Sequence, residues 1–225
     1  MPRKLHNHLF ILCFLLANPW PIADAQTAAP QFGAVPPPAP GRSATPAKEL
    51  PAAALLAELK RGGYTIYFRH TSTDFSRDDT KSRSDDDCEN QRPLTSKGRD
   101  EARRIGEDMR ALGIPIGDIL ASPRCRTVEV AKLAFGSFKP APEARGGVAG
   151  EKPSIHYDAL RALFDKGPGT SRNTIIVSHG NPFYAIAGAP YLAEGEAAII
   201  NPLGKDFEVI ARVRWDGWKN LAAAS

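Results

Sequence analysis

The stretch YTIYFRH, from Tyr64 to His70, opens with a β-branched and aromatic run that is nearly all apolar and too short for a helix. Such a run is typical of a strand that is buried on both faces, as in a parallel sheet. The run TIIVS at residues 174–178 has the same character and is followed at once by His179. A third strand is expected over residues 114–121, which end in three apolar positions.

Helices are expected between these strands, because apolar residues recur there at spacings of three and four. The expected elements are helices at residues 51–61, 95–112, 126–135 and 155–165, and a final hairpin with strands at 197–201 and 207–213. This alternation predicts an α/β fold, a three-layer α/β/α sandwich with a mainly parallel sheet and an antiparallel edge hairpin.

The first 25 residues have the pattern of a secretory signal peptide, with basic Arg3 and Lys4, a short apolar run and a small-residue Ala23-Asp24-Ala25 site. The apolar run is too short to cross a bilayer, which needs about 20 residues, so no stable membrane anchor is expected after cleavage. Residues 26–47 are rich in Pro and Ala and predict an extended linker, and residues 48–225 fit one domain. We therefore expect a periplasmic or secreted protein.

Charge and cysteine content narrow the class further. The formal net charge is +4 with both signs mixed along the chain, which does not resemble a nucleic-acid-binding patch but suits an anionic substrate. Cleavage would leave Cys88 and Cys125. Two cysteines in an exported chain favour a disulfide, with two buried thiols as the alternative.

Basic residues follow the expected strands. Arg69 and His70 follow the first, His179 follows the run at 174–178, and Arg126 comes shortly after the strand at 114–121. Because ligands bind beyond the carboxyl ends of parallel strands, these side chains are expected to converge on one anion site. Arginine forks match phosphate oxygens, and a neutral imidazole attacks phosphorus, so phosphoryl transfer is the expected chemistry. No metal-ligand spacing surrounds these residues, and no metal or cofactor is expected.

Four motifs occur in the order of a known family. They are Phe68-Arg69-His70, Leu94-Thr95-x-x-Gly98, Ser122-Pro123-x-x-Arg126 and Ser178-His179-Gly180-Asn181. Together they resemble the histidine phosphatase superfamily, in its phosphoglycerate mutase-like branch, over residues 64–213. The resemblance implies that fold for the domain at 48–225.

The resemblance also implies roles for individual residues. His70 would be the nucleophile, Arg69 and Arg126 phosphate ligands, and His179 a second histidine on the phosphoryl group. Gly180 and Asn181 would place backbone N–H groups near the phosphate, whereas Arg124 is not the matching arginine and is expected at the surface or rim.

Two positions depart from the family pattern. Thr71 stands where the family has glycine, and its side chain is expected to narrow the pocket or shift the loop. The general acid has no obvious counterpart. The candidates are Asp74, Asp158, Glu194 and Glu196, and we favour Glu196 because the final hairpin should begin near the active edge.

Several other features have plainer interpretations. Residues 85–87 form an acidic run that we interpret as part of a solvated loop rather than a cation site. That loop would shape the pocket mouth if Cys88 bonds to Cys125. His156 is interpreted as structural or exposed, and Trp215 and Trp218 as closing the core or the sheet edge rather than lining a sugar site.

The sequence thus predicts an exported, metal-independent phosphomonoesterase that acts through a phosphohistidine at His70. One alternative is a phosphoglycerate-type mutase, and another is a secreted phosphate-binding module without turnover. The expected substrate is a small-molecule phosphomonoester, and the likeness to exported family members suggests a phosphorylated sugar of the cell envelope.

Overall fold

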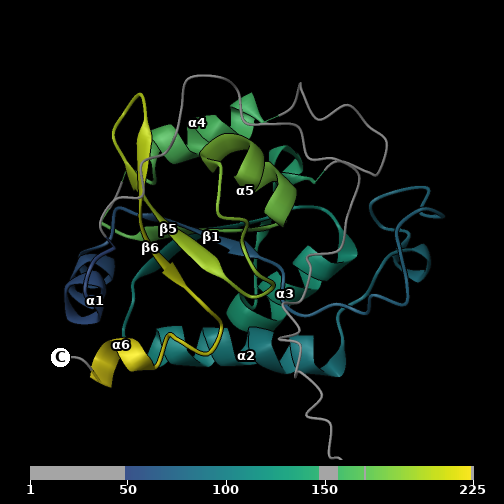
Figure 1. Ribbon diagram of the computed structural model, residues 1–225, viewed down its shortest axis with the longest axis horizontal. Coiled ribbons are helices and arrows are strands. Elements are labelled where there is room, and N and C mark those ends of the chain that lie inside the picture. Colours follow the sequence, from purple (N-terminus) through teal and green to yellow (C-terminus); the bar gives the residue numbers. More distant parts are fainter. Residues whose placement is uncertain (1–48, 147–156, 170, 224–225) are drawn as a thin grey trace, which may run out of the picture. The chain divides into compact units, whose positions relative to one another are not determined.

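The strand of the opening stretch, β1 (Thr65–Arg69), lies inside a sheet whose order is β3-β2-β4-β1-β5-β6 (Figure 1). The structure, a computed structural model, describes residues 49–146, 157–169 and 171–223. The expected signal segment, the expected linker and His156 lie outside these residues.

Parallel strands make up most of the sheet. β1 pairs in parallel with β4 (Asn173–Ser178), β4 with β2 (Ile116–Ala121), and β2 with the short β3 (Lys139–Pro140). On the other side β1 pairs antiparallel with β5 (Ala197–Pro202), which continues into β6 (Phe207–Val213). The predicted mainly parallel sheet with an antiparallel edge hairpin is confirmed, while β3 was not predicted.

The helices lie on both faces of the sheet (Figure 1). They are α1 (Ala52–Arg61), α2 (Ser96–Ala111), α3 (Cys125–Phe135), α4 (Asp158–Lys166), α5 (Gly180–Ala187) and α6 (Asn220–Ala223). Two single-turn 3₁₀ helices of the described part, η1 (Cys88–Asn90) and η2 (Pro142–Ala144), lie in connecting loops. The sequence prediction omitted α5 and the short α6.

Alternate residues of β1 face the two layers of helices. Ile66 and Phe68 belong to the hydrophobic cluster that includes residues of α1, α2 and α3, whereas Tyr67 belongs to the cluster with Phe164 of α4 and Phe183 of α5. All three β1 side chains are essentially inaccessible to solvent. The strand is therefore buried on both faces, and the predicted three-layer arrangement is confirmed.

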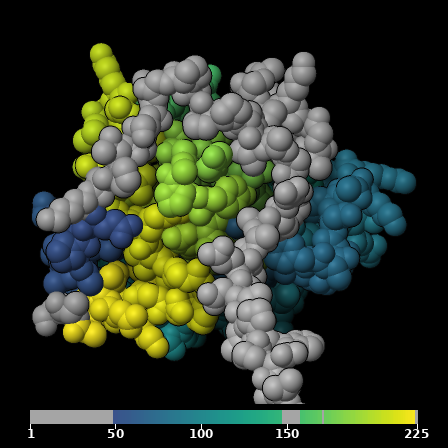
Figure 2. Space-filling model, viewed as in Figure 1, coloured from purple at the N-terminus to yellow at the C-terminus, as the bar shows by residue number. Residues whose placement is uncertain are grey.

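The C-terminal segment packs on the layer that contains α1. α6 contacts α1, and the space-filling view shows the yellow C-terminal segment beside the dark blue α1 (Figure 2). Trp218 precedes α6, is fully buried, and packs against the ring of Phe68 at a centroid distance of 5.7 Å. Trp218 thus closes the core, as the sequence indicated.

A disulfide joins Cys88 of η1 to Cys125 at the start of α3, with a Cα–Cα distance of 5.6 Å. The predicted pairing is present. It ties the long loop at residues 71–92 to the segment that carries Arg126.

The Cys88→Ser variant should be less stable than the wild type by about 2–4 kcal/mol, because the disulfide restricts the unfolded chain. Urea denaturation without reductant measures this difference. Adding a thiol reductant should lower wild-type stability to that of the variant and leave the variant unchanged. Equal stability of both proteins without reductant would contradict the prediction.

Candidate active site

The two histidines of the site are held by adjacent parallel strands. His70 follows β1, and its backbone N–H donates to the Ser178 carbonyl at 3.0 Å. His179 follows β4 and precedes the first turn of α5. The two imidazole centroids lie 5.5 Å apart. The structure therefore brings both sequence-predicted histidines to one edge of the sheet.

Tyr67 supports the backbone next to His179. Its hydroxyl lies 2.7 Å from Ser178 Oγ and donates to the His179 carbonyl at 2.8 Å. Burial raises the pKa of Tyr67 well above its ordinary value, so the phenol stays neutral. The buried contacts fix the backbone from which His179 projects.

The hydrogen bonding of His70 indicates which ring nitrogen carries the proton. Nδ1 lies 3.0 Å from the Thr71 carbonyl oxygen, which accepts a hydrogen bond and cannot donate one. In the neutral ring the proton is therefore on Nδ1, and Nε2 carries the free lone pair. Burial, followed by the charges of Arg126 and Arg69, lowers the pKa of His70 well below its usual value. His70 is thus a neutral imidazole at pH 7.

His179 is buried and neutral for the same reasons. Burial is the largest cause of its lowered pKa, and Arg126, Arg124, Arg69 and Arg92 act in the same direction. Its Nε2 lies 2.9 Å from Ser122 Oγ, which sits just beyond the end of β2. Three neighbouring strands thus contribute to the position of one imidazole.

Arg69 and Arg126 flank the histidines and are both largely buried. Arg69 donates to the Leu192 carbonyl at 2.7 Å, and Arg126 pairs with Asp79 at 3.0 Å. Burial lowers the pKa of Arg126 to about 10, so it remains charged at pH 7. The Nε atoms of both arginines are buried without a hydrogen-bond partner among the described residues. Such unsatisfied buried donors point to an absent acceptor.

Two further arginines join this cluster, and sequence reasoning missed both. Arg92 is only 8% exposed, and burial lowers its pKa, while Glu194 and Asp79 raise it. Arg124 was expected at the surface or rim but is 3% exposed, with Nε 3.5 Å from Asp85. That prediction was wrong, because the loop at residues 71–92 covers Arg124. Both arginines stand within or beside the motifs quoted above, and that position is a signal that could have identified them.

The acidic run at residues 85–87 has a structural role that the sequence did not reveal. Asp85 pairs with Arg145 at 2.8 Å as well as with Arg124. Asp86 is exposed, as expected for a solvated loop. Among the described residues no cluster of three or more His, Cys, Asp or Glu side chains is placed to hold a metal ion. The loop is instead tied down by ion pairs and the disulfide.

The carboxylate beside His70 is Glu194 and not Glu196. Glu194 Oε1 lies 3.8 Å from His70 Nδ1 and 3.5 Å from Arg69, and it accepts a 2.6 Å hydrogen bond from the Thr73 hydroxyl. Glu196 accepts from the Ala193 N–H at 2.7 Å and pairs with Arg212 of β6. The hairpin does begin at the active edge, but its register directs the Glu196 side chain toward β6. The acidic side chain that we expected near His70 is therefore that of Glu194 and not that of Glu196.

The other two acid candidates lie in exposed positions. Asp74 is partly exposed, and hydrogen bonds from the Ser76 side chain and backbone lower its pKa. Asp158 is the exposed first residue of α4. Neither contacts His70 in the structure described.

Gly180 and Asn181 begin α5 and support Tyr191. A Cβ atom at Gly180 would lie 2.2 Å from Tyr191 Cζ, so only glycine leaves room for this ring. The Tyr191 hydroxyl donates to Asn181 Oδ1 at 2.7 Å. The Asn181 side chain is thereby engaged with Tyr191, and the expected role of the backbone N–H groups of this first helical turn as anion donors stays a prediction.

No protein-family model matches this sequence, and no curated protein matches it. Solved structures do match it. The structure resembles those of histidine phosphatases.

One such structure is the protein histidine phosphatase SixA with tungstate, at 20% identity and a TM-score of 0.48, covering 68% of this chain and 97% of that one. Another is YhfR of Bacillus stearothermophilus, at 20% identity and a TM-score of 0.46, covering 65% and 94%. A mutant phosphoserine phosphatase of Entamoeba histolytica with phosphoserine has 13% identity and a TM-score of 0.45, covering 66% and 95%.

Thr71, the departure from the histidine phosphatase pattern, does not face the histidines. Its hydroxyl is buried and donates to the Gly98 carbonyl in the first turn of α2 at 2.7 Å. The side chain therefore does not narrow the space around the histidines, and the alternative expectation, a shift of the loop, stays a prediction. The side chain instead joins the segment that follows His70 to α2.

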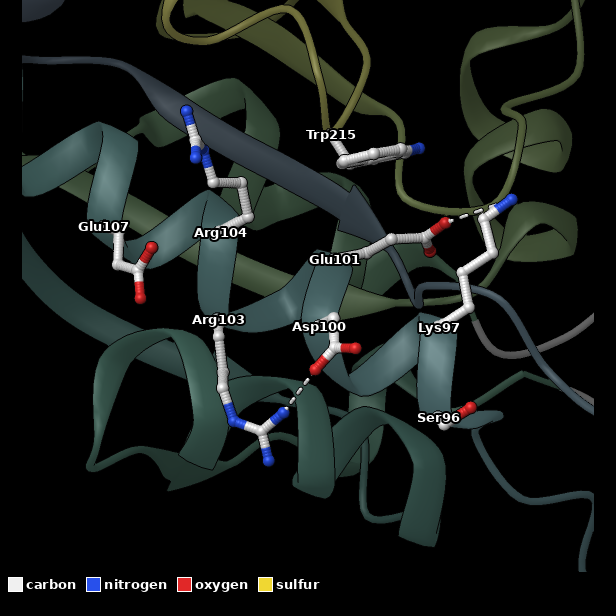
Figure 3. A pocket seen from close by; sticks show the side chains of 8 residues that line it. All are labelled: Ser96, Lys97, Asp100, Glu101, Arg103, Arg104, Glu107 and Trp215. Atoms are coloured by element: carbon white, nitrogen blue, oxygen red, sulfur yellow. Dashed lines mark hydrogen bonds and ion pairs between the residues drawn. The ribbon is translucent and has the colours of Figure 1, made fainter.

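A separate groove of about 580 Å³ lies on the outer face of α2 (Figure 3). Its lining residues are Ser96, Lys97, Asp100, Glu101, Arg103, Arg104, Glu107 and Trp215. Several of these charges pair with one another, as Arg103 does with Asp100 at 2.8 Å. None of the predicted site residues lines the groove, which is a solvated helix face beside Trp215.

Proposed function

We propose that this protein is an exported, metal-independent phosphomonoesterase that works through a phosphohistidine at His70. The observation that carries the proposal is the set of buried guanidinium donors around two neutral imidazoles. Arg69 Nε and Arg126 Nε have no hydrogen-bond partner among the described residues, and His70 Nε2 is the free nitrogen of its ring. A phosphate dianion supplies the acceptors, and its phosphorus is the atom a nucleophilic nitrogen attacks.

The reaction then has two steps. His70 Nε2 forms a bond to phosphorus while the bond from phosphorus to the ester oxygen breaks, and the leaving oxygen takes a proton from solvent. Water next attacks the phosphorus and loses one proton to solvent, the bond from phosphorus to Nε2 breaks, and inorganic phosphate leaves with the neutral His70 restored. Arg69, Arg126 and the neutral His179 bind the phosphoryl oxygens and stabilise the charge that develops on them.

Glu194 is proposed as a positioning residue. Its carboxylate holds Arg69 and the Thr73 hydroxyl and lies near His70 Nδ1, on the side of the ring that does not react. A carboxylate on that side favours the tautomer with Nδ1 protonated. It therefore keeps Nε2 available for phosphorus.

Export is part of the proposal. The Cys88–Cys125 disulfide supports an oxidising compartment, since such bonds are rare in the cytosol. The helices of the described residues include none with the length and apolar character needed to span a membrane. The signal-peptide pattern of residues 1–25 favours export to the periplasm or the cell exterior.

Hydrolysis of para-nitrophenyl phosphate in the presence of a chelator tests the function. The expected result is steady release of nitrophenol and inorganic phosphate in equal amounts, unchanged by the chelator. Transfer of the phosphoryl group to an alcohol acceptor in place of water would identify the mutase alternative. Tight phosphate binding without turnover of any ester would identify the binding module and refute the proposal.

A further inference from the structure

Three large apolar side chains stand out as exposed among the described residues. They are Phe75 at 52%, Tyr191 at 39% and Leu203 at 60%. Single exposed apolar residues are common at protein surfaces. Phe75 and Tyr191 are different, because each stacks on an arginine of the anion site.

Tyr191 forms one wall of the site. Its ring centroid lies 5.2 Å from Arg69 Cζ, and it packs on Gly180 at the start of α5. The ring is held by the bond to Asn181 and by Tyr184, whose centroid is 5.9 Å away. Burial raises the pKa of Tyr191, while the charges of Arg69 and Arg92 act in the opposite direction, so both guanidiniums lie near this phenol.

Phe75 is a second aromatic side chain beside an arginine of this cluster, and it lies on the loop at residues 71–92. Its ring centroid lies 4.7 Å from Arg92 Cζ. Arg92 in turn interacts electrostatically with Glu194, Asp79, Arg69 and Tyr191. The charge of Arg92 also lowers the pKa of His179. Phe75 is therefore attached, through one buried arginine, to the same site that Tyr191 borders.

Resting on the proposed function, we infer that Phe75 and Tyr191 bind the leaving group of the substrate, and that this group is a planar aromatic ring. Two partly exposed aromatic rings beside an anion site offer apolar contact and edge or face stacking to a ring attached to the phosphate. The natural ester would be a phosphate of a phenol. The phosphate enters the arginine cluster, and the ring lies at the mouth between the two side chains.

The carboxylates around the site agree with such a leaving group. Glu194 and Asp79 are paired with Arg69 and Arg126 respectively. An ionised carboxylate accepts hydrogen bonds and donates none. A phenol, with a pKa of about 10, leaves as phenolate with less help from a proton donor than an alcohol requires.

The test compares phenyl phosphate, glycerol 2-phosphate and a hexose 6-phosphate in the wild type and in Phe75→Ala. For phenyl phosphate kcat/KM should fall about tenfold in the variant, mainly through KM, because the ring contact is lost. For the other two esters it should change by less than about twofold, as should inhibition by inorganic phosphate.

Two further variants serve as controls. Leu203→Ala removes the third exposed apolar side chain, in the turn at the far end of the β5–β6 hairpin, and should leave all three rates unchanged. Tyr191→Phe keeps the ring but loses the bond to Asn181, and its preference for phenyl phosphate over the other two esters should stay within about threefold of the wild-type preference.

Equal losses on all esters in Phe75→Ala, or a loss on the hexose phosphate as large as on phenyl phosphate, would overturn the inference. Neither result would affect the proposed function, because turnover would persist. Failure of the wild type to hydrolyse any ester would instead refute the proposed function itself.

Discussion

The His70→Ala variant should lose at least about 10⁴-fold in kcat for para-nitrophenyl phosphate, since removal of a covalent nucleophile leaves only binding and charge stabilisation. Nε2 of His70 carries no proton, because the proton of the neutral ring is on Nδ1 and is donated to the Thr71 carbonyl. Alanine removes the attacking atom but leaves the arginines in place. Initial rates at saturating substrate measure the loss.

Binding of inorganic phosphate provides the control for His70→Ala. The guanidiniums of Arg69 and Arg126 do not depend on the imidazole for their contacts with Leu192 and Asp79. Phosphate affinity measured by calorimetry should therefore fall by less than about tenfold. A variant that binds phosphate and still turns over at more than a tenth of the wild-type rate would show that another group attacks phosphorus.

The Arg126→Ala variant should lose about 10³-fold in kcat/KM, because a buried charged donor that stabilises the transition state is removed. The acid limb of its pH profile, where kcat/KM falls as the pH is lowered, should also move to higher pH. The charge of Arg126 is the second cause, after burial, of the lowered pKa of His70. Without it that pKa rises toward its ordinary value, so His70 becomes protonated, and inactive, at a higher pH than in the wild type. A kcat/KM profile from pH 4 to 8 measures the shift.

Asp79→Asn changes the other member of the ion pair that Arg126→Ala removes. Both carboxylate oxygens of Asp79 contact Arg126 Nη1, at 3.0 and 3.1 Å. Asp79 therefore competes with phosphate for this guanidinium. An amide competes less well with phosphate for this cation, so inhibition by inorganic phosphate should strengthen in Asp79→Asn. An acid limb that does not move in Arg126→Ala, or weaker phosphate inhibition in Asp79→Asn, would contradict this account of the electrostatics.

The arrangement of the sheet was predictable because buried strands leave a strong local pattern. The apolar runs at β1 and β4 predicted both strands and, through the rule for parallel sheets, the meeting of His70 with His179. The helix α5 was missed because it has only eight residues and contains Pro182. β3 was missed because a two-residue strand has no period to recognise.

The buried charges of the site were less predictable. Arg92 and Arg124 appear in sequence as ordinary loop charges, and only the fold of residues 71–92 shows that they are covered. The choice between Glu194 and Glu196 depended on which side chain faces β6, which is a matter of register across a tight turn. Local patterns do not contain that information, because it comes from pairing between distant segments.

The central claim is tested most directly by trapping the intermediate. The protein is mixed with para-nitrophenyl phosphate, quenched in alkali within milliseconds, digested, and analysed by mass spectrometry for a phosphorylated histidine. The account predicts an alkali-stable, acid-labile phosphoryl group on His70 that forms and decays at rates consistent with turnover. Phosphate on His179, or steady turnover with no phosphorylated His70 at any time point, would contradict it.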